Sequence, residues 1–490
     1  MWISSLLCIS SWICIASAMR TRGNSRSTFK MSSSLLDTKI APVGGSWFPI
    51  LAKSGCKGVV LPISVEVAGE KLVAWKSPIT SEWSVMMDAC PHRLAPLSQG
   101  RVDPITGCIE CPYHGQQFDG TGACTKIPQN SRDVIPTGTS AIALPVHSSG
   151  DLLWAFLPLS PGQASNYPTL PEIVFPELMD GPSFFTRDLP YSFDFLVENF
   201  MDPSHIPFAH HSLQGSRKDG SPIPMQVITS RDNATHVEVA FQDSISGKAR
   251  DGVVSFIAPF YYHFRTRSAK TGLFNKNLIA VLTPVSPGVS RLFLELPALR
   301  KLQGKLPVWL SHSLSNKFLD TDVWVHEQER TQRAGVNPYL QHENPTVEHV
   351  EPDGTRSPSS VGNKYVLTTE SDTGTRAWRR WWKQHMASSP IFGEPRIPLP
   401  WISRESQLNR YENHTKYCSS CRGALANANT VKKLLPFIAI AIVTILPNKV
   451  LKIMGLIASY LVNEAAEWVR RNILGYRRGE VSSAAQFAGK

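Results

Sequence analysis

The spacing of hydrophobic residues divides this chain into a β-rich first part, a mixed second part and a helical tail. From residue 45 to about 160, short apolar runs alternate with turns rich in Gly, Pro and Ser. Examples are Gly58–Val67, Lys71–Trp75 and Leu152–Leu157. Short runs bounded by turn residues favour antiparallel strands. We therefore predict a β domain over residues 45–160.

Residues 180–400 mix strand-like and helical patterns, which predicts a second domain of α+β type. The helical patterns lie near residues 193–213 and 307–335. The strand-like runs are Val237–Phe241, Val253–Phe256, Asn277–Thr283 and Arg291–Leu296. The stretch 340–362 is rich in Pro, Glu, Gly and Ser and predicts a loop.

The tail contains an apolar run of 14 residues, Leu434–Pro447, and a weaker one, Ile453–Val462. Fourteen residues are fewer than the ~20 that a helix needs to cross a bilayer. Polar residues around Lys449 separate the two runs. We predict a membrane anchor over residues 431–465, as a tight hairpin or re-entrant segment rather than two full spans.

A tryptophan cluster precedes this tail, and two interpretations of it stay open. Trp378, Trp381 and Trp382 alternate with basic residues. They would suit the lipid headgroup level of a membrane, and they would equally suit a hydrophobic core.

The first 36 residues predict a two-part leader. Residues 2–18 are apolar and end in Ala16-Ser17-Ala18, the small-residue pattern of a signal-peptidase site. Residues 19–36 contain basic and hydroxyl residues but no acid, like a transit peptide. The order resembles leaders of plastid proteins in algae with secondary plastids. Plain secretion or a signal anchor is the alternative.

Length, charge and cysteine content limit the function classes. A chain of 490 residues suggests two or three domains. Its net charge of +11 lies partly in the termini, without the aromatic interleaving of a nucleic-acid binder, so we expect no nucleic-acid partner. Nine cysteines at these spacings do not suggest a disulfide framework.

Two short runs carry metal-ligating chemistry: Cys90-Pro91-His92 and Cys111-Pro112-Tyr113-His114, with 18 residues between His92 and Cys111. Two Cys and two His suit a [2Fe–2S] cluster in which histidines bind one iron. The alternative is tetrahedral zinc. Zinc motifs usually pair Cys with Cys and His with His, however, whereas each run here mixes the two.

A second metal site is indicated downstream. His205 and His210 are spaced for two ligands that converge from a helix and the turn after it. Two histidines and one carboxylate form the facial triad that leaves positions for O2 at Fe(II). The neighbouring His211 would point elsewhere.

The runs CPHRLAPLSQG and CPYHGQQFDGTG resemble the two boxes of Rieske-type non-haem iron oxygenases. They lack the extra Cys that Rieske electron carriers have in each box. The resemblance implies a Rieske cluster in the β domain and a helix-covered antiparallel sheet as the catalytic domain. It also implies Asp322 as the third iron ligand. Asp320 is the alternative ligand. Asp322 could also be a solvated acid near a helix start, with no role in metal binding.

The resemblance implies a further role for Asp202. This residue would bridge the iron ligand His205 and the Rieske ligand His114 of a neighbouring subunit, in a head-to-tail homotrimer. The alternative is a plain helix cap.

Residues 410–425 contain the CxxC pair Cys418 and Cys421, after Arg410–Tyr417. A CxxC pair can react with thioredoxin. It could also be half of a zinc site, although no second half follows it, or two ordinary cysteines. The whole run resembles the redox segment of the pheophorbide a oxygenase group, which includes the Rieske component of the chloroplast inner-envelope translocon.

The group implies a membrane-anchored plastid monooxygenase, in the envelope or the thylakoid. It would use O2, electrons from reduced ferredoxin, and a chlorophyll-type tetrapyrrole such as pheophorbide a or a chlorophyllide. The alternative from another class is a redox-sensing Rieske component of the plastid protein import machinery.

Overall fold

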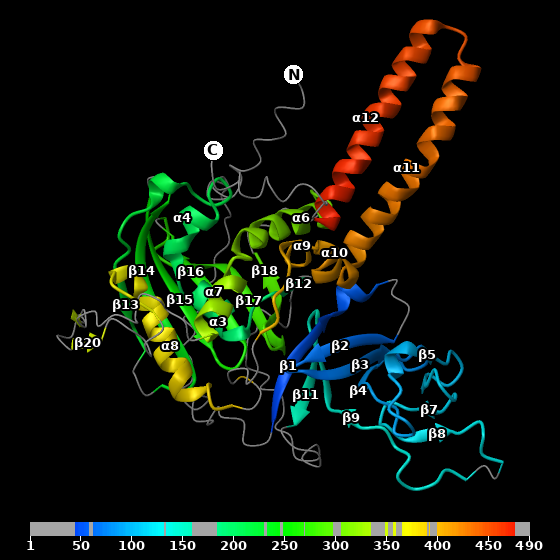
Figure 1. Ribbon diagram of the computed structural model, residues 1–490, viewed down its shortest axis with the longest axis horizontal. Helices are drawn as coiled ribbons and strands as arrows, with labels where there is room; N and C mark the ends of the chain where they lie inside the picture. Colours follow the sequence, from blue (N-terminus) through cyan, green and yellow to red (C-terminus); the bar gives the residue numbers. More distant parts are fainter. Residues whose placement is uncertain are drawn as a thin grey trace.

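The computed structural model describes most of the chain between residues 45 and 475 (Figure 1). The described ranges are 45–57, 62–131, 134–158, 184–229, 233–245, 248–268, 270–296, 305–334, 348–350, 356–358, 365–389, 392 and 399–475. The expected leader lies outside them. So does most of the expected loop at 340–362, apart from strands β19 (Glu348–Val350) and β20 (Arg356–Pro358), which pair with each other.

The first domain is built from three antiparallel sheets, as the sequence predicted. Their orders are β1-β11-β10, β2-β3-β4-β9 and β5-β6-β7-β8. The strands are β1 (Gly45–Ala52), β2 (Ile63–Val67), β3 (Glu70–Lys76), β4 (Trp83–Met87), β5 (Arg101–Val102), β6 (Ile109–Glu110), β7 (Gln117–Phe118), β8 (Cys124–Lys126), β9 (Ala143–Leu144), β10 (Val146–Ser149) and β11 (Leu152–Pro158).

Strand β3 has apolar residues at consecutive positions, not alternating with polar ones, because both of its faces are packed. Leu72 and Ala74 face one hydrophobic cluster, while Val73 and Trp75 face another. Both faces of the strand are therefore buried. The indole N–H of Trp75 also donates to the carbonyl of Gly107, at 3.2 Å, and so ties this core to the turn between the two Cys/His runs.

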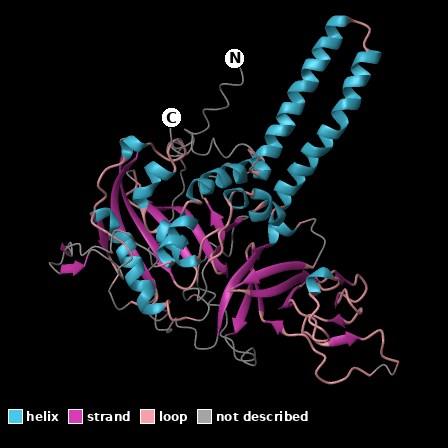
Figure 2. Ribbon diagram, in the orientation of Figure 1, coloured by secondary structure: helices cyan, strands magenta, loops and turns pink. Residues whose placement is uncertain are grey.

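The second domain contains one seven-stranded antiparallel sheet in the order β12-β18-β17-β16-β15-β14-β13. Its strands are β12 (Phe185–Leu189), β13 (Met225–Val227), β14 (His236–Ile245), β15 (Lys248–Ile257), β16 (Tyr261–Arg267), β17 (Phe274–Ser286) and β18 (Val289–Glu295). Its helices are α3 (Phe193–Phe200), α4 (Ile206–Ala209), α6 (Val308–Leu319), α7 (Val325–Arg333) and α8 (Thr373–His385). Figure 2 shows these helices alongside the sheet, so the expected helix-covered sheet is confirmed.

The tryptophan cluster belongs to the core of this domain. Trp378, Trp381 and Trp382 lie on α8 and are 0%, 5% and 3% exposed. The indole of Trp378 donates to the carbonyl of Asp194 in α3, at 2.9 Å. Of the two interpretations left open by the sequence, the core one is correct.

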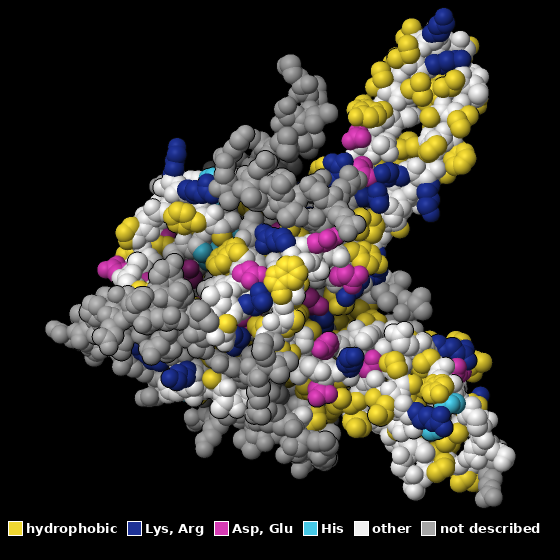
Figure 3. All heavy atoms as spheres, in the orientation of Figure 1, with side chains coloured by type: hydrophobic (Ala, Val, Ile, Leu, Met, Phe, Trp, Pro, Cys, Tyr) yellow, Lys and Arg dark blue, Asp and Glu magenta, His cyan; other side chains and the backbone are white. Residues whose placement is uncertain are grey.

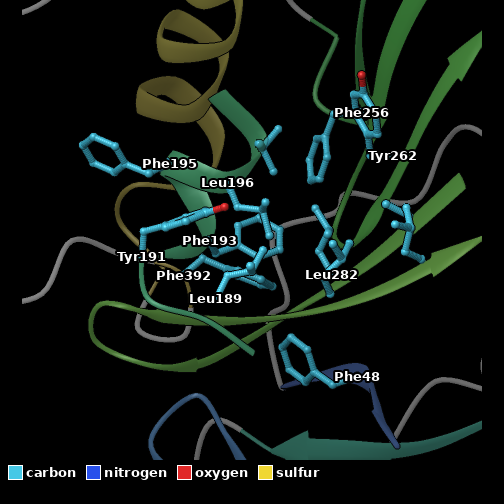
Figure 4. Close-up of a cluster of buried hydrophobic side chains, with 14 of the residues drawn as sticks. Phe48, Leu189, Tyr191, Phe193, Phe195, Leu196, Phe256, Tyr262, Leu282 and Phe392 are labelled. Carbon is cyan, nitrogen blue, oxygen red and sulfur yellow. The ribbon is translucent and has the colours of Figure 1, made fainter. Parts of the chain in front are cut away.

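The two domains share one hydrophobic core. Phe48 of β1 belongs to the same cluster as Leu282 of the large sheet and Phe392 (Figure 4). The hydroxyl of Thr283 donates to the carbonyl of Pro49, at 2.7 Å. The β domain is therefore packed directly against the large sheet.

The tail forms a long helical hairpin that projects from the body of the molecule (Figure 1). Helix α11 (Ser419–Ile445) and helix α12 (Lys449–Leu474) contain 27 and 26 residues, so each is about 40 Å long. A hairpin was expected, but both helices extend well beyond the apolar runs that predicted it. Short helices α9 (Arg404–Gln407) and α10 (Arg410–Asn413) connect its base to the second domain.

A buried ionic network holds the hairpin base to the sheet. Asp320, in the short 3-10 helix η8 (Asp320–Asp322) after α6, accepts from Arg187 of β12 at 2.6 Å and from Arg410 at 2.7 Å. Arg410 also donates to the carbonyl of Asn472 in α12, at 2.6 Å. Because a buried charge is costly unless paired, this network fixes the position of η8.

Candidate metal centres

The two Cys/His runs form two loops with the same backbone pattern. Cys90 N–H donates to the carbonyl of Ala95, and Cys111 N–H to that of Gln116, both at 2.8 Å. In each loop the residue four places after the Cys donates back to the Cys carbonyl and has a positive φ, 59° at Leu94 and 71° at Gly115. The loops are thus equivalent halves of one site at the tip of the β5–β8 sheet.

The thiols of this site face inward and the imidazoles outward. Cys90 and Cys111 are 1% and 2% exposed, and their side chains interact. His92 is exposed and His114 half-buried, with ring centroids 4.7 Å apart. Burial raises the pKa of the Cys90 thiol to about 11, so a metal must displace its proton.

The donor set fits a [2Fe–2S] cluster better than zinc. A Rieske cluster needs two thiolates on one iron and two imidazoles on the other, which is the pairing seen here. A single zinc ion needs all four donors together. In the described part of the chain, these four are not among the groups of donors that lie within 4.8 Å of one another.

His205, His210 and Asp322 do form such a group, within 4.8 Å. His205 ends the 3-10 helix η6 (Pro203–His205), His210 follows α4, and Asp322 ends η8. His210 Nε2 lies 3.3 Å from Asp322 Oδ2. The structure therefore brings together the two histidines and the carboxylate that the sequence singled out.

Hydrogen bonds set the orientation of both imidazole rings. His205 Nδ1 donates to the carbonyl of Asp202 at 2.5 Å. His210 Nδ1 donates to Thr321 Oγ1 at 2.7 Å, because that hydroxyl gives its own hydrogen to the carbonyl of Phe318. Such bonds leave each Nε2 unprotonated and free to bind a metal. Thr321 was not among the residues selected from the sequence.

The carboxylate of Asp322 is buried beside two imidazoles. It is 2% exposed, its Oδ1 has no hydrogen-bond partner, and burial raises its pKa to about 6. Burial, followed by the proximity of His205, lowers the pKa of His210 to about 2, so that ring is neutral. Two imidazoles and a carboxylate with an unpartnered oxygen suit a divalent cation with open positions.

The other candidate ligands of this centre, Asp320 and His211, make contacts elsewhere. Asp320 lies between two arginines and not with the histidines. His211 accepts from the backbone N–H of Arg217 at 3.2 Å and lies outside the group.

Asp202 has two features at once. Its Oδ1 accepts from Ser204 N–H at 2.8 Å, so it caps η6. Its Oδ2 lies 3.9 Å from His205 Nδ1, and the side chain is 28% exposed. The carboxylate is therefore both a cap and a partly exposed group beside His205.

A third group of donors was not predicted. Cys418 and Cys421 lie at the start of α11, and within 4.8 Å of them are His312 of α6 and His414. A hydrogen bond from Cys421, aided by the two imidazoles, lowers the pKa of the Cys418 thiol. His414 stands four places before Cys418, a spacing that could have drawn attention to it. His312 is 106 positions away, and only the fold brings it there.

Comparison with known proteins follows the same division of the chain. Family models match at residues 46–147 (Rieske [2Fe-2S] domain) and 256–337 (Pheophorbide a oxygenase). The chain is 32% identical to a chloroplastic pheophorbide a oxygenase of Oryza sativa subsp. japonica, covering 79% of this chain and 74% of the relative.

Two further relatives have different names. The protochlorophyllide-dependent translocon component 52 of Arabidopsis thaliana is 29% identical, over 80% of this chain and 75% of its own. The flavonoid 8-hydroxylase 2 of Ocimum basilicum is also 29% identical, over 84% and 80%. Both are chloroplastic proteins by name.

Replacing Asp322 tests the iron site against its neighbour Asp320. We expect Asp322→Ala to lower the iron content from about three to about two atoms per chain, with the visible absorption of the cluster retained. Asp320→Asn should keep all of the iron. It should instead destabilise the fold by about 3–5 kcal/mol, because it weakens a buried ion pair. Metal analysis and denaturant unfolding followed by tryptophan fluorescence measure the two effects. The opposite pattern would transfer the ligand role to Asp320.

Proposed function

The chain belongs to the Rieske-type non-haem iron oxygenases, in the pheophorbide a oxygenase-like group, and from this premise we propose that it oxidises a chlorophyll-type tetrapyrrole. It is an O2-dependent oxidoreductase that takes electrons from a donor protein. A pheophorbide or a chlorophyllide is the proposed substrate class, supported by the names of relatives that match over most of their length. The flavonoid hydroxylase makes a phenolic substrate the competing class.

The observation that carries an enzymatic function is the triad. A buried carboxylate with an unpartnered oxygen beside two oriented imidazoles is costly unless a cation binds there. A redox sensor would need the cluster, but it would have no use for the second group of ligands, His205, His210 and Asp322. The import-machinery role remains the second candidate, and the name of the translocon relative supports it.

The residues have distinct roles in this proposal. Cys90, Cys111, His92 and His114 would hold the cluster, and His205, His210 and Asp322 the iron. When bound, these groups supply one-electron transfer and O2 activation. Thr321 orients His210 through its hydroxyl, while the Asp202 carbonyl orients His205. The backbone and side-chain contacts thus fix the ligand geometry before any substrate arrives.

Electron transfer in this proposal crosses between subunits. In Figure 1 the strands β5–β8 and helix α4 lie at opposite ends of the molecule, so the cluster loops of a chain are remote from its own triad. Each centre has exposed apolar side chains beside it: Leu94 and Tyr113 are 75% and 58% exposed, and Phe208 is 55% exposed. We propose that these patches meet in a head-to-tail homotrimer, because a heterologous contact closes into a ring. Asp202 would then bridge His205 and the partner's His114.

The electron donor proposed is a reduced ferredoxin. Arg93 and Lys126 are exposed on the domain that carries the cluster and favour an acidic carrier protein. A thioredoxin partner for Cys418 and Cys421 stays a prediction, since both thiols are buried, at 7% and 2% exposure.

We propose a plastid membrane as the location, supported by relatives named chloroplastic and by the hairpin. Helix α11 is long and apolar enough to cross a membrane, and only 11% of its most apolar window is buried. Hydrophobic side chains cover the outer part of the hairpin, with lysines at its tip (Figure 3). The apolar part between Lys433 and Leu446 is about 20 Å long, less than a full hydrocarbon core. A shallow hairpin therefore fits better than two full spans.

The hairpin proposal predicts the effect of charges on its exposed face. Phe437 and Ile440 are 69% and 63% exposed. We expect Phe437→Asp with Ile440→Asp to release the protein from liposomes, since each Asp costs about 2.5–3.5 kcal/mol in a bilayer centre. Trp401→Asp, at a residue 63% exposed outside the hairpin, is the matched control. Flotation measures both, and unchanged binding by the double variant would exclude the hairpin as the anchor.

A single-turnover assay tests the function and names the substrate class. The iron-loaded protein is reduced without oxygen, then given O2 with pheophorbide a, chlorophyllide a, protochlorophyllide a or a flavone in turn. We expect an oxygenated tetrapyrrole that is absent with His205→Ala. A product from the flavone alone would replace the substrate class. Full oxidation of the cluster with no product from any of the four would favour the redox-sensing role.

Mixed subunits test the path between chains. A Cys111→Ser chain lacks the cluster and an Asp322→Ala chain lacks the iron, so each alone should be inactive. Equal amounts of the two chains are mixed and allowed to form trimers of random composition. About a quarter of the interfaces then join an intact cluster to an intact iron site. We expect activity to recover to about that fraction of the unaltered protein.

The same mixture isolates the role of Asp202. Asn is as good a helix cap as Asp, so Asp202→Asn should keep η6 intact. Placed in the Cys111→Ser chain, it should abolish the recovered activity. Placed in the Asp322→Ala chain, which has no iron to receive electrons, it should change nothing. Equal effects in both chains would reduce Asp202 to a structural role, and no recovery in any mixture would refute the inter-subunit path.

A further inference from the structure

Four metal-ligating side chains converge at the base of the hairpin, away from both centres described above. They are His312, His414, Cys418 and Cys421, and their donor atoms all lie within 4.8 Å of one another. The four residues are 9%, 1%, 7% and 2% exposed. The two cysteines are free thiols in the structure, not a disulfide.

The distances between these donors match the edges of a tetrahedral metal site. With Zn–S of about 2.3 Å and Zn–N of about 2.0 Å, tetrahedral geometry places N and S about 3.5 Å apart. His312 Nδ1 lies 3.3 Å from Cys418 Sγ and 3.8 Å from Cys421 Sγ. His414 Nε2 lies 3.3 Å from Cys421 Sγ. A binuclear cluster would need a wider arrangement, such as that of the Rieske loops.

The rings are supported as metal ligands usually are. His414 Nδ1 donates to the carbonyl of Thr186 at 2.6 Å, which leaves Nε2 directed at the thiols. Phe185 stacks on His414, with ring centroids 4.5 Å apart, and meets His312 edge-on at 5.3 Å. Strand β12 thus supplies both the hydrogen-bond acceptor and an apolar wall that excludes water.

We propose that these four residues bind a structural Zn²⁺ ion. Two thiolates and two imidazoles, fully enclosed, form the ligand set of closed zinc sites, whereas catalytic zinc sites keep one position open. Binding displaces the protons of the two thiols and requires no oxidant or reductant. The CxxC pair is then half of a zinc site, and its other half precedes it in the sequence.

The position of this site gives the ion a mechanical role. Cys418 and Cys421 begin α11, the first helix of the hairpin, and His312 lies in α6, whose continuation is η8 with Asp322. The ion would join the hairpin base to the segment that carries an iron ligand. Failure of this inference would leave the oxygenase proposal intact, because the zinc site shares no residue with either iron centre.

Metal analysis of the purified full-length protein tests the site. We expect about one zinc per chain in addition to the iron. Cys421→Ser and His414→Ala should each lower zinc at least tenfold while the visible absorption of the Rieske cluster, in the other domain, reports a folded chain. Cys56→Ser, at a half-buried cysteine outside the four, should keep the zinc. Zinc retained by both ligand variants would overturn the assignment.

A second measurement on the unaltered protein covers variants that fail to fold. Titration with an organomercurial should release one zinc in step with two thiols, and those thiols should resist a bulky disulfide reagent until the zinc leaves. A Cys418–Cys421 disulfide found by mass spectrometry, thiols that react without releasing zinc, or a protein with iron but no zinc would each overturn the proposal. The first of these results would support the redox function of the CxxC pair.

Discussion

The need to compensate buried carboxylates organises the catalytic half of this molecule. Asp194 and Glu198 pair with Arg379, and Asp320 pairs with Arg187 and Arg410. Asp322 is also buried, but its neighbours are two imidazoles instead of arginines, and one of its oxygens has no hydrogen-bond partner. Since an isolated buried charge is costly to keep, a divalent metal bound to the Asp322 carboxylate would stabilise it. Because Asp194, Glu198 and Asp320 are already paired with arginines, we expect a metal at Asp322 and not at these three carboxylates.

One helical segment, α6 with its continuation η8, positions both Asp320 and Asp322. His312, Asn316 and Asp320 are four residues apart, so they lie on one face of α6 and its continuation. That face meets β12 and the hairpin base, through Arg187, Arg410 and the two cysteines. Thr321 and Asp322 continue the same segment but turn to the histidines. The segment Val308–Asp322 therefore links the tail of the chain to the proposed iron centre, so a displacement at one end would move the other.

The sequence was most informative where ligands are close together in the chain. The two Cys/His runs are local patterns whose chemistry can be recognised from spacing. The pair His205 and His210 is also local, but its metal role was inferred from these runs and the family resemblance. The choice between Asp320 and Asp322 could not be made that way, because both lie in the same short turn. It depends on Arg187 and Arg410, which arrive from distant elements. His312 shows the same limit, since nothing near it in the chain marks it as a partner of Cys418. The length of the tail helices was also underestimated, because apolar content predicted only the apolar runs and not the polar turns that extend both helices.

The hairpin and the proposed trimer constrain each other. In a closed ring of three chains, the hairpins are related by the threefold axis. All three can enter one bilayer only if that axis lies along the membrane normal. The contacts between a cluster loop and a neighbouring triad then lie side by side in a plane parallel to the membrane, at equal heights above it. In such a trimer every iron centre would have the same distance to the lipid surface, and a hydrophobic substrate in the bilayer would meet three equivalent sites.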